Sequence, residues 1–356
     1  MSIKHSDNQT FSFEILRWYS QNPRELPWRG IDDPYKIWLS EIILQQTRIA
    51  QGLPYYEKFV KAYPRVADLA IAPEDEVLRM WQGLGYYSRA RNLHACAKHI
   101  WFERNGEFPN TYQGLLTLKG VGSYTASAIA SFAFGEAKAV VDGNVFRVLA
   151  RYFGIDTDIA SGRGKKEFES LADRLIPADQ PGEYNQAIMD FGSRQCLPLN
   201  PDCSSCPLQE SCFAFQKDLV KSLPVKINKI KIKERNFHYY IIRCGEHWVW
   251  KKRKAGDIWE GLFDFPQIEA SKKEPSQELD LPIVASERVE YPKKYRHILS
   301  HQKLNAVFSE MEIAEENLSD LQEWADKRNY QLVAEDRIDY LAKPKLIVNF
   351  LNDHGF

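Results

Sequence analysis

The chain has 356 residues, of which 44% are hydrophobic and 13% aromatic, and its formal net charge is −1. This length favours two or three domains, and the composition supports ordinary globular cores and argues against intrinsic disorder. The near-zero charge excludes a uniformly basic surface, so any surface for an anionic partner must be local. The polar first ten residues do not resemble a signal peptide, and no apolar run is long enough to predict a membrane-spanning helix.

Residues 10 to about 215 show a helical pattern. Apolar residues recur at spacings of three and four, as in Leu39, Ile42 and Ile43. Helix-ending signals such as Asp33-Pro34 and Asn105-Gly106 divide the pattern into short segments. The sequence therefore predicts roughly ten short helices and no strand in this part.

The pattern changes after Cys212. Residues 217–235 hold seven Lys or Arg and two acidic residues, which is typical either of a solvated linker or of a linker that also contacts DNA. The rest predicts a mixed α+β domain. We expect a hairpin from the strands 237–243 and 247–252, further strands at 283–289 and 304–313, and helices at 315–327 and 343–351.

Two glycines, Gly120 and Gly122, interrupt a helical pattern just before a helix that begins near Ser123. We expect positive φ angles at both glycines and uncovered backbone N–H groups at the helix start, which favour an anion such as a phosphate. A bare Gly-x-Gly is usually an ordinary helix corner. Together with Asp142, which follows the second helix, the segment resembles the helix-hairpin-helix element of DNA repair glycosylases.

Four of the six cysteines lie within 17 residues of sequence, at spacings that favour a metal centre over disulfides: Cys196, Cys203, Cys206 and Cys212. The spacing by itself does not separate a zinc site from a [4Fe–4S] cluster, and zinc is the commoner structural site. After a helix-hairpin-helix, however, this spacing resembles the iron–sulfur loop of the endonuclease III and MutY branch of glycosylases. The resemblance implies a structural [4Fe–4S] cluster.

Glu41 lies in Trp38-Leu-Ser-Glu-Ile-Ile-Leu-Gln-Gln-Thr47, an apolar helical run that should raise its pKa and favour the protonated acid. The string resembles the signature of MutY-type adenine DNA glycosylases, and Glu41 falls where that family keeps its general acid. Asp142 is either a helix N-cap or a carboxylate that stabilises positive charge on the sugar. The resemblance implies the second role, compatible with the first, and makes Asn144 its positioning partner.

Tyr124 indicates the reaction type. In the lyases of this superfamily a lysine at this position attacks the sugar to form a Schiff base, and a phenol cannot do so. The sequence therefore predicts hydrolysis by water.

Further DNA contacts are implied by the resemblance alone. Gln46 and Tyr86 resemble the family's two intercalating segments, which fill the gap left by a flipped base. Arg29 and Gln186 resemble its contacts to the flipped adenine. For Tyr86, as for Tyr124, core packing is the alternative explanation.

The segment Gly256–Pro266 resembles the C-terminal domain of MutY proteins, which is Nudix-like. The metal-binding box of a Nudix hydrolase is missing downstream, so we expect a reader module without pyrophosphatase activity. Ser300 and His301 align with the family's Phe-Ser-His loop, whose serine contacts 8-oxoguanine. Leu299 replaces the phenylalanine, which puts the strength of lesion reading in doubt.

The sequence thus predicts an all-α helix-hairpin-helix glycosylase domain with an iron–sulfur loop at 196–212, plus a C-terminal α+β Nudix-like domain. The expected boundaries are 1–216, a basic linker at 217–234, and 235–356. The expected protein is a cytoplasmic monomer that removes adenine opposite 8-oxoguanine from double-stranded DNA and contacts no membrane. The alternatives are an endonuclease III-type pyrimidine glycosylase/lyase and a non-catalytic damage-binding protein with a structural zinc.

Overall fold

The structure is a computed structural model and describes residues 5–227, 232–270, 279–299 and 301–356. The chain divides into two compact units. The first unit comprises Met1–Gly52, Val60–Ala70 and Ala95–Asn228. The second comprises Leu53–Phe59, Ile71–His94 and Lys229–Phe356. The boundaries expected from the sequence at 216 and 235 stay predictions.

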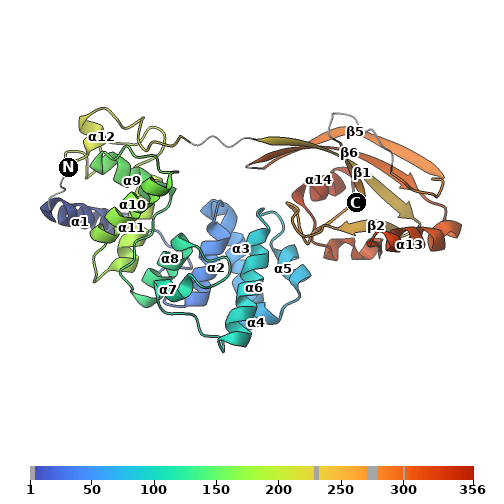
Figure 1. The fold of residues 1–356 in the computed structure, drawn as a ribbon, viewed down its shortest axis with the longest axis horizontal. Coiled ribbons are helices and arrows are strands. Elements are labelled where there is room, and N and C mark those ends of the chain that lie inside the picture. Colours follow the sequence, from blue (N-terminus) through green and yellow to red (C-terminus); the bar gives the residue numbers. More distant parts are fainter. Residues whose placement is uncertain (1–4, 228–231, 271–278, 300) are drawn as a thin grey trace. The chain divides into compact units, whose positions relative to one another are not determined.

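The described residues up to 227 form helices and no strand, as the sequence predicted (Figure 1). No helix in the described part of the chain is both long and apolar enough to cross a membrane. The helices are α1 (His5–Gln21), α2 (Pro34–Leu44), α3 (Ile49–Ala62), α4 (Val66–Ile71), α5 (Glu74–Met80), α6 (Ser88–Glu103), α7 (Tyr112–Leu115), α8 (Ser123–Phe134), α9 (Gly143–Phe153), α10 (Gly162–Leu175), α11 (Pro181–Arg194) and α12 (Phe213–Gln216).

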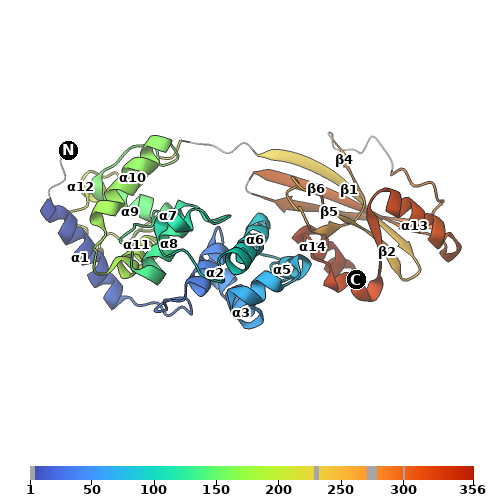
Figure 2. The ribbon, with the colours of Figure 1, turned by 60° about the horizontal axis from the view of Figure 1, so that its bottom comes forward.

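One hydrophobic core of the first unit joins α1, α9, α10 and α11, and Figure 2 shows α1 beside α11. The ring of Phe11 lies 4.6 Å from that of Tyr152, and Trp18 meets Phe191 edge to face at 5.1 Å. Each fully buried side chain of this size contributes about 1.5–3 kcal/mol. This core fixes α9 and α11, which carry one side of the site described below.

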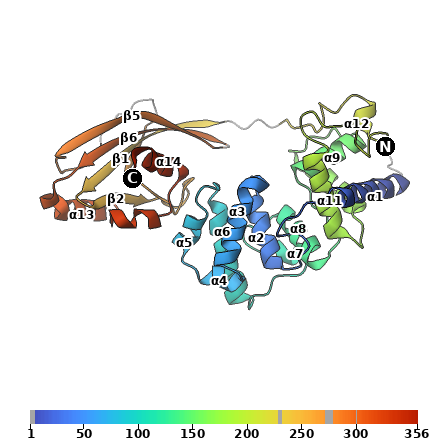
Figure 3. The same ribbon diagram turned by 180° about the vertical axis from the view of Figure 1, so that it is seen from behind.

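The other side of that site is built by α2 against α8, which lie side by side in Figures 1 and 3. α8 is rich in alanine, and Ala126, Ala128 and Ala130 are completely buried. Such small side chains permit close approach of the neighbouring helix. At the end of α2, Nε2 of Gln45 donates a hydrogen bond to Oγ1 of Thr125 at 3.2 Å, which ties the following turn to α8.

The C-terminal residues form a mixed seven-stranded sheet with the order β3-β2-β1-β6-β5, in which β4 also pairs with β1 and β7 with β2. β1 and β6 are parallel, and the other pairs are antiparallel. The strands are β1 (Lys233–Cys244), β2 (His247–Lys252), β3 (Phe263–Asp264), β4 (Gln267–Ala270), β5 (Glu287–Ile298), β6 (Gln302–Glu312) and β7 (Tyr330–Ala334).

A helix packs on each face of this sheet. Tyr240 belongs to the core that includes Trp324 of α13 (Leu318–Lys327). Its neighbour Tyr239 stacks on Phe308, which in turn stacks on Phe350 of α14 (Lys345–His354) at 4.0 Å. Because successive residues of a strand point to opposite faces, α13 and α14 cover opposite sides of the sheet.

Most predicted elements of this part are confirmed, and one is wrong. The hairpin of β1 and β2, the strand at 304–313 and both helices are present, although a short 3₁₀ turn, Glu315–Asn317, precedes α13. The strand predicted at 283–289 begins only at Glu287 and continues to Ile298. Residues 287–290 are exposed although they lie in a strand, because β5 is the edge of the sheet.

Candidate active site

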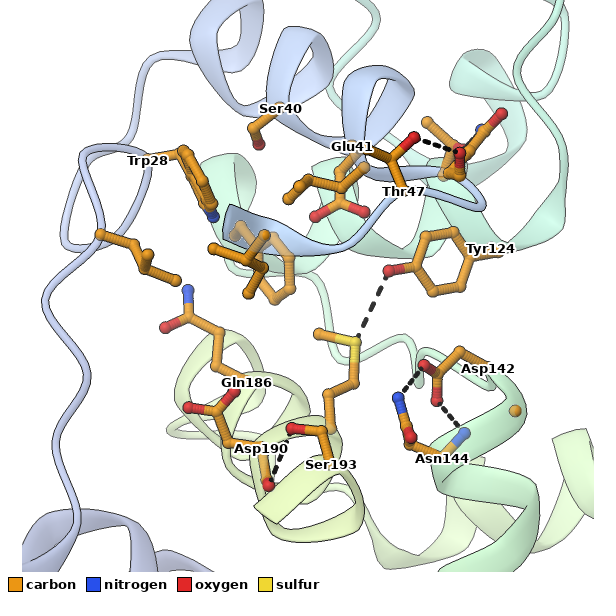
Figure 4. A pocket seen from close by; sticks show the side chains of 18 of the residues that line it. Trp28, Ser40, Glu41, Thr47, Tyr124, Asp142, Asn144, Gln186, Asp190 and Ser193 are labelled. Carbon is orange, nitrogen blue, oxygen red and sulfur yellow. Dashed lines mark hydrogen bonds between the residues drawn. The ribbon is translucent and has the colours of Figure 1, made fainter. Parts of the chain in front are cut away.

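A cavity of about 1020 Å³ in the first unit is lined by α2, α8, α11 and the start of α9 (Figure 4). The turn after α2 and residues 24–29 complete its wall. The fold thereby gathers side chains from four separate stretches of sequence. The site residues that the sequence predicted and that line this cavity are Arg29, Glu41, Gln46, Gly122, Tyr124, Asp142, Asn144 and Gln186.

The position of Glu41 is fixed by the start of α2. Asp33 caps this helix by accepting hydrogen bonds from two backbone N–H groups of the first turn, and Pro34 takes the first helical position. Almost every following residue of α2 is buried. Glu41 is itself only 7% exposed, although its carboxyl faces the cavity.

The surroundings of Glu41 favour its protonated form. Burial raises the pKa of this carboxyl from 4.5 to about 7, and the negative charge of Asp142 adds to the rise. A hydrogen bond with Tyr124 and the positive charge of Arg29 act in the opposite direction. The sequence predicted this raised pKa, and the cause is the expected one, removal from water.

Asp142 is held by three hydrogen bonds at the start of α9. Its Oδ1 accepts from the backbone N–H groups of Asn144 and Val145, both at 2.8 Å. Its Oδ2 accepts from Nδ2 of Asn144 at 2.7 Å. Burial raises the pKa of Asp142, and these bonds limit the rise. Asp142 is therefore an N-cap whose fixed carboxylate also faces the cavity (Figure 4).

Arg147, which no sequence motif indicated, connects this carboxylate to the cysteine loop through Asn144. Its Nη2 donates to Oδ1 of Asn144 at 2.9 Å, and its Nε donates to the carbonyl oxygen of Cys196 at 2.7 Å. Arg147 is 8% exposed. Because Cys196 lies 49 residues away in sequence, no local pattern could have identified this contact.

Tyr124 points into the cavity from the first turn of α8 (Figure 4). Its hydroxyl lies 3.6 Å from Sδ of Met189 and interacts with the carboxylate of Glu41. Burial, Glu41 and Asp142 together raise the pKa of this phenol, so it stays neutral. Among the described residues that line the cavity, none is a lysine.

The hairpin before α8 has one of the two expected glycine conformations. Gly120 has a φ of +79°, as predicted. Gly122 has a φ of −91° and a ψ of 179°, so the prediction of a positive φ is wrong there. Gly122 is instead the N-cap of α8, and a side chain on it would meet open space. Because Gly122 has no side chain, the first backbone N–H groups of α8 stay uncovered.

Arg29 and Gln186 each have a partner that the sequence did not indicate. The guanidinium of Arg29 binds the carboxylate of Asp190 through two hydrogen bonds of 2.8 Å. Oε1 of Gln186 accepts a hydrogen bond from the hydroxyl of Tyr19 at 3.0 Å. Both partners lie more than 160 residues away in sequence from the residue they hold.

The two predicted intercalating residues share an unusual backbone conformation. Gln46 has a φ of +56° and Tyr86 a φ of +48°, and both side chains are exposed. Non-glycine residues with positive φ are uncommon and cluster at functional sites. The shared positive φ is consistent with a functional position for both residues, and their role in DNA binding stays a prediction.

The four predicted metal ligands are free, partly buried thiols, and three of them, Cys196, Cys206 and Cys212, pack against the core of the first unit. Burial raises the pKa of Cys203, Cys206 and Cys212, and the charge of Cys196 raises each further. Nη1 of Arg151 donates to Sγ of Cys196 at 3.4 Å. Within the described residues, no group of three His, Cys, Asp or Glu side chains has an arrangement that could hold a metal ion. Four cysteine thiols in one loop are a donor set of the kind that holds iron–sulfur clusters.

The loop between β5 and β6 is described only in part. The backbone N–H of Leu299 donates to the carbonyl of Gln302 at 2.8 Å, which closes the hairpin. His301 is exposed, and its carbonyl accepts a hydrogen bond from the backbone N–H of Lys233 at 3.0 Å. Ser300 lies outside the described residues.

Comparison with known families agrees with this architecture. Residues 39–177 match the HhH-GPD superfamily of base excision DNA repair proteins, and residues 238–353 match the NUDIX domain. The fold and the cavity thus define a helix-hairpin-helix DNA repair glycosylase with a Nudix-like domain.

Similarity to curated proteins narrows this class. The chain is 38% identical over 256 residues to an adenine DNA glycosylase of Buchnera aphidicola, covering 71% of this chain and 72% of that protein. The human adenine DNA glycosylase is 43% identical over 216 residues, covering 58% of this chain and 40% of that protein. The chain belongs to the adenine DNA glycosylase family, whose members are hydrolases acting on N-glycosyl bonds.

Solved structures share the fold of the helical part. A thermostable thymine-DNA glycosylase superposes with a TM-score of 0.54 and 31% identity, covering 59% of this chain and 97% of that one. Endonuclease III trapped covalently on DNA gives a TM-score of 0.54 at 24% identity, covering 61% of this chain and all of that one. At this identity the second likeness concerns the fold alone.

Proposed function

We propose that this protein is a monofunctional DNA glycosylase that hydrolyses the N-glycosidic bond of adenine mispaired with 8-oxoguanine or guanine in duplex DNA, as a step of base-excision repair. The observation that carries the proposal is the pair of carboxyl groups in one cavity. Glu41 has a pKa of about 7 and is available as an acid, whereas Asp142 is fixed by three hydrogen bonds.

In this proposal Glu41 is the general acid. Its proton passes to N7 of a flipped adenine, which makes the base a better leaving group. The bond between the sugar C1′ and the base then breaks, and its electron pair leaves with adenine. A pKa near neutrality suits this task, because a useful fraction of the enzyme carries the proton at physiological pH.

Asp142 stabilises the positive charge that develops on the sugar. A fixed carboxylate in a partly dry cavity needs little rearrangement when that charge appears. Asn144 positions it through the bond to Oδ2. Water then adds to C1′ and its proton passes to the Glu41 carboxylate, which restores the acid and leaves an abasic site. No strand break follows, because Tyr124 cannot form the Schiff base that a lysine would form.

The remaining cavity residues and the hairpin engage DNA. The uncovered N–H groups around Gly120 and Gly122 suit a backbone phosphate. Arg29 and Gln186 line the cavity, and in this proposal they contact the adenine ring. Gln46 and Tyr86 fill the space left in the duplex when the base is flipped out.

The Nudix-like domain reads the opposite base. Adenine is a normal base, so specificity requires recognition of the partner strand, and 8-oxoguanine differs from guanine at O8 and at N7–H. Ser300 and His301 are the proposed readers, by resemblance to the family's Phe-Ser-His loop. We place this domain at 235–356, the glycosylase domain at 1–216 and a linker at 217–234.

Cys196, Cys203, Cys206 and Cys212 would hold a [4Fe–4S] cluster. Bound there, the cluster would be structural and would order the loop that Arg147 joins to Asn144. Free thiols of this kind fit a reducing cytoplasm, where we expect the enzyme to act as a monomer.

A panel of duplexes tests the proposal. Each carries a single adenine opposite 8-oxoguanine, guanine or thymine, and free adenine is measured under single-turnover conditions. We expect fast release opposite 8-oxoguanine, slower release opposite guanine and none opposite thymine. Release of a pyrimidine base from the matching control duplexes, without adenine release, would instead support the endonuclease III-type alternative.

A further inference from the structure

The turn between α5 and α6 presents an exposed aromatic ring on a strained backbone. Gly83, Gly85 and Tyr86 have φ angles of +103°, +72° and +48°. The side chain of Tyr86 is 45% exposed. A tyrosine is costly to hold in the left-handed region, so contacts around the turn must maintain this conformation.

Arg89 supplies several of these contacts from the first turn of α6. It is 9% exposed. Its Nη2 donates to the carbonyl oxygens of Gly85 at 3.2 Å and Leu84 at 3.4 Å, and its backbone N–H donates to the carbonyl of Tyr86 at 2.9 Å. Burial lowers the pKa of Arg89 to about 10, so the guanidinium remains charged at neutral pH.

The same guanidinium contacts two aromatic rings. Cζ of Arg89 lies 5.0 Å from the ring centroid of Trp81 and 5.7 Å from that of Tyr86. Nε1 of Trp81 also donates to the carbonyl of Gly85 at 3.1 Å. One carbonyl of the turn thus receives two side-chain donors, and the Tyr86 ring receives a cation–π contact.

The beginning of the turn is fixed independently by Tyr55. Its hydroxyl donates to the carbonyl of Gln82 at 2.7 Å. A Cβ atom at Gly83 would lie 2.5 Å from that hydroxyl oxygen, so a larger residue does not fit there. The turn is therefore held at both ends, and Tyr86 is the exposed residue at its tip.

We infer that Arg89 is a positioning residue for Tyr86: it holds the turn and the ring in the orientation that Tyr86 needs to insert into the duplex. The inference rests on the proposed function, in which Tyr86 fills the gap left by the flipped adenine. A ring that is already held loses less conformational freedom on insertion. Lysine cannot replace Arg89, because a single ammonium lacks the planar fork that donates to carbonyls while contacting two rings.

The test measures base opening rather than excision. The full-length protein is mixed with a duplex that carries 2′-fluoro-2′-deoxyadenosine opposite 8-oxoguanine, which resists hydrolysis because fluorine destabilises the oxocarbenium ion. A neighbouring 2-aminopurine reports opening by its fluorescence. The variants are Arg89→Lys, Arg89→Gln, Tyr86→Phe, Tyr86→Ala and the double variant Arg89→Lys/Tyr86→Ala, with exposed Arg104→Lys as the matched control. The melting temperature of each variant is recorded.

We expect Arg89→Lys and Tyr86→Ala each to lower the opening equilibrium about tenfold, which equals about 1.4 kcal/mol. Arg89→Gln should resemble Arg89→Lys. Tyr86→Phe, which keeps an aromatic ring, should lose less opening than Tyr86→Ala, and Arg104→Lys should resemble the parent. In the double variant the loss should stay near tenfold, because a residue that acts through Tyr86 has no further effect once Tyr86 is gone.

A hundredfold loss in the double variant would overturn the inference, since Arg89 would then act independently of Tyr86. So would unchanged opening in both Arg89 variants. If Tyr86→Ala itself has no effect, Tyr86 is not the residue that fills the gap, and the inference fails with that assignment. Adenine release by the parent enzyme would still test the proposed chemistry separately.

Discussion

Replacement of Glu41 by glutamine should remove both the catalytic proton and a specific destabilising charge. Burial and Asp142 raise the pKa of Glu41 from 4.5 to about 7. One pKa unit corresponds to 1.36 kcal/mol, so ionising Glu41 costs about 3 kcal/mol more in the folded protein than in the unfolded chain. Because the folded pKa is raised, the free energy of unfolding keeps its full value below pH 4.5, where Glu41 is protonated in both states. It falls by about 3 kcal/mol as the pH rises from 4.5 through about 7.

The same ionisation should control the reaction rate. The parent enzyme should excise adenine at a constant single-turnover rate below pH 7 and lose about tenfold per pH unit well above it, because only protonated Glu41 donates. Glu41→Gln should be slower by ~10²–10⁴-fold and should lack this alkaline decline. DNA binding should survive in the variant, since glutamine keeps the shape of the side chain.

The assay is adenine release at saturating enzyme between pH 5.5 and 9, with exposed Glu57→Gln as the matched control. Thermal melting at the ends of this range gives the second readout. The melting temperature of Glu41→Gln relative to the parent should rise with pH by several degrees, at about 2–4 °C per kcal/mol for a domain of this size. A parent rate that does not change through pH 7, or near-parental excision by Glu41→Gln, would refute the assignment of the acid.

Four other perturbations have definite expectations. Tyr124→Phe removes the hydrogen bond that lowers the pKa of Glu41, so the alkaline decline of the rate should move to higher pH. Asp142→Asn should keep α9 capped, because asparagine caps as well as aspartate, but excision should fall by at least ~10²-fold, with melting as the check on folding. His301→Ala should reduce the preference for 8-oxoguanine over guanine by about tenfold or less, measured as a ratio of excision rates. Cys203→Ser should lower iron content and visible absorbance and lower the melting temperature, whereas a zinc site would show no visible absorbance in the parent.

The residue types of the cavity were readable from the sequence because each lies in a local motif. Glu41 stands in an apolar helical run, and Asp142 and Asn144 stand where a helix must begin. The contacts that hold these side chains in place could not be predicted from the sequence. Arg147 binds the carbonyl of Cys196, which lies 49 residues away, and Asp190 binds Arg29, which lies 161 residues away. The burial of a polar side chain likewise depends on helices that no local pattern specifies.

The same limit explains the errors in the fold. β1 and β6 have enough apolar residues to be predicted, since both are central strands with two covered faces. β5 is an edge strand with a register shift between Tyr291 and Tyr295 and with Pro292 inside it, so its hydrophobic alternation is lost. The positive φ predicted for Gly122 is wrong because a glycine can serve by lacking a side chain as well as by adopting a positive φ.

The central claim, hydrolysis of the adenine glycosidic bond without strand cleavage, is tested most directly by the products of one turnover. A duplex with adenine opposite 8-oxoguanine is incubated with the enzyme and analysed before and after alkali, with a parallel sample in borohydride. We predict one equivalent of free adenine, an intact strand before alkali, cleavage after alkali and little covalent adduct. Immediate strand cleavage with efficient borohydride trapping would contradict the account, since both require an amine nucleophile that the described cavity lining does not provide.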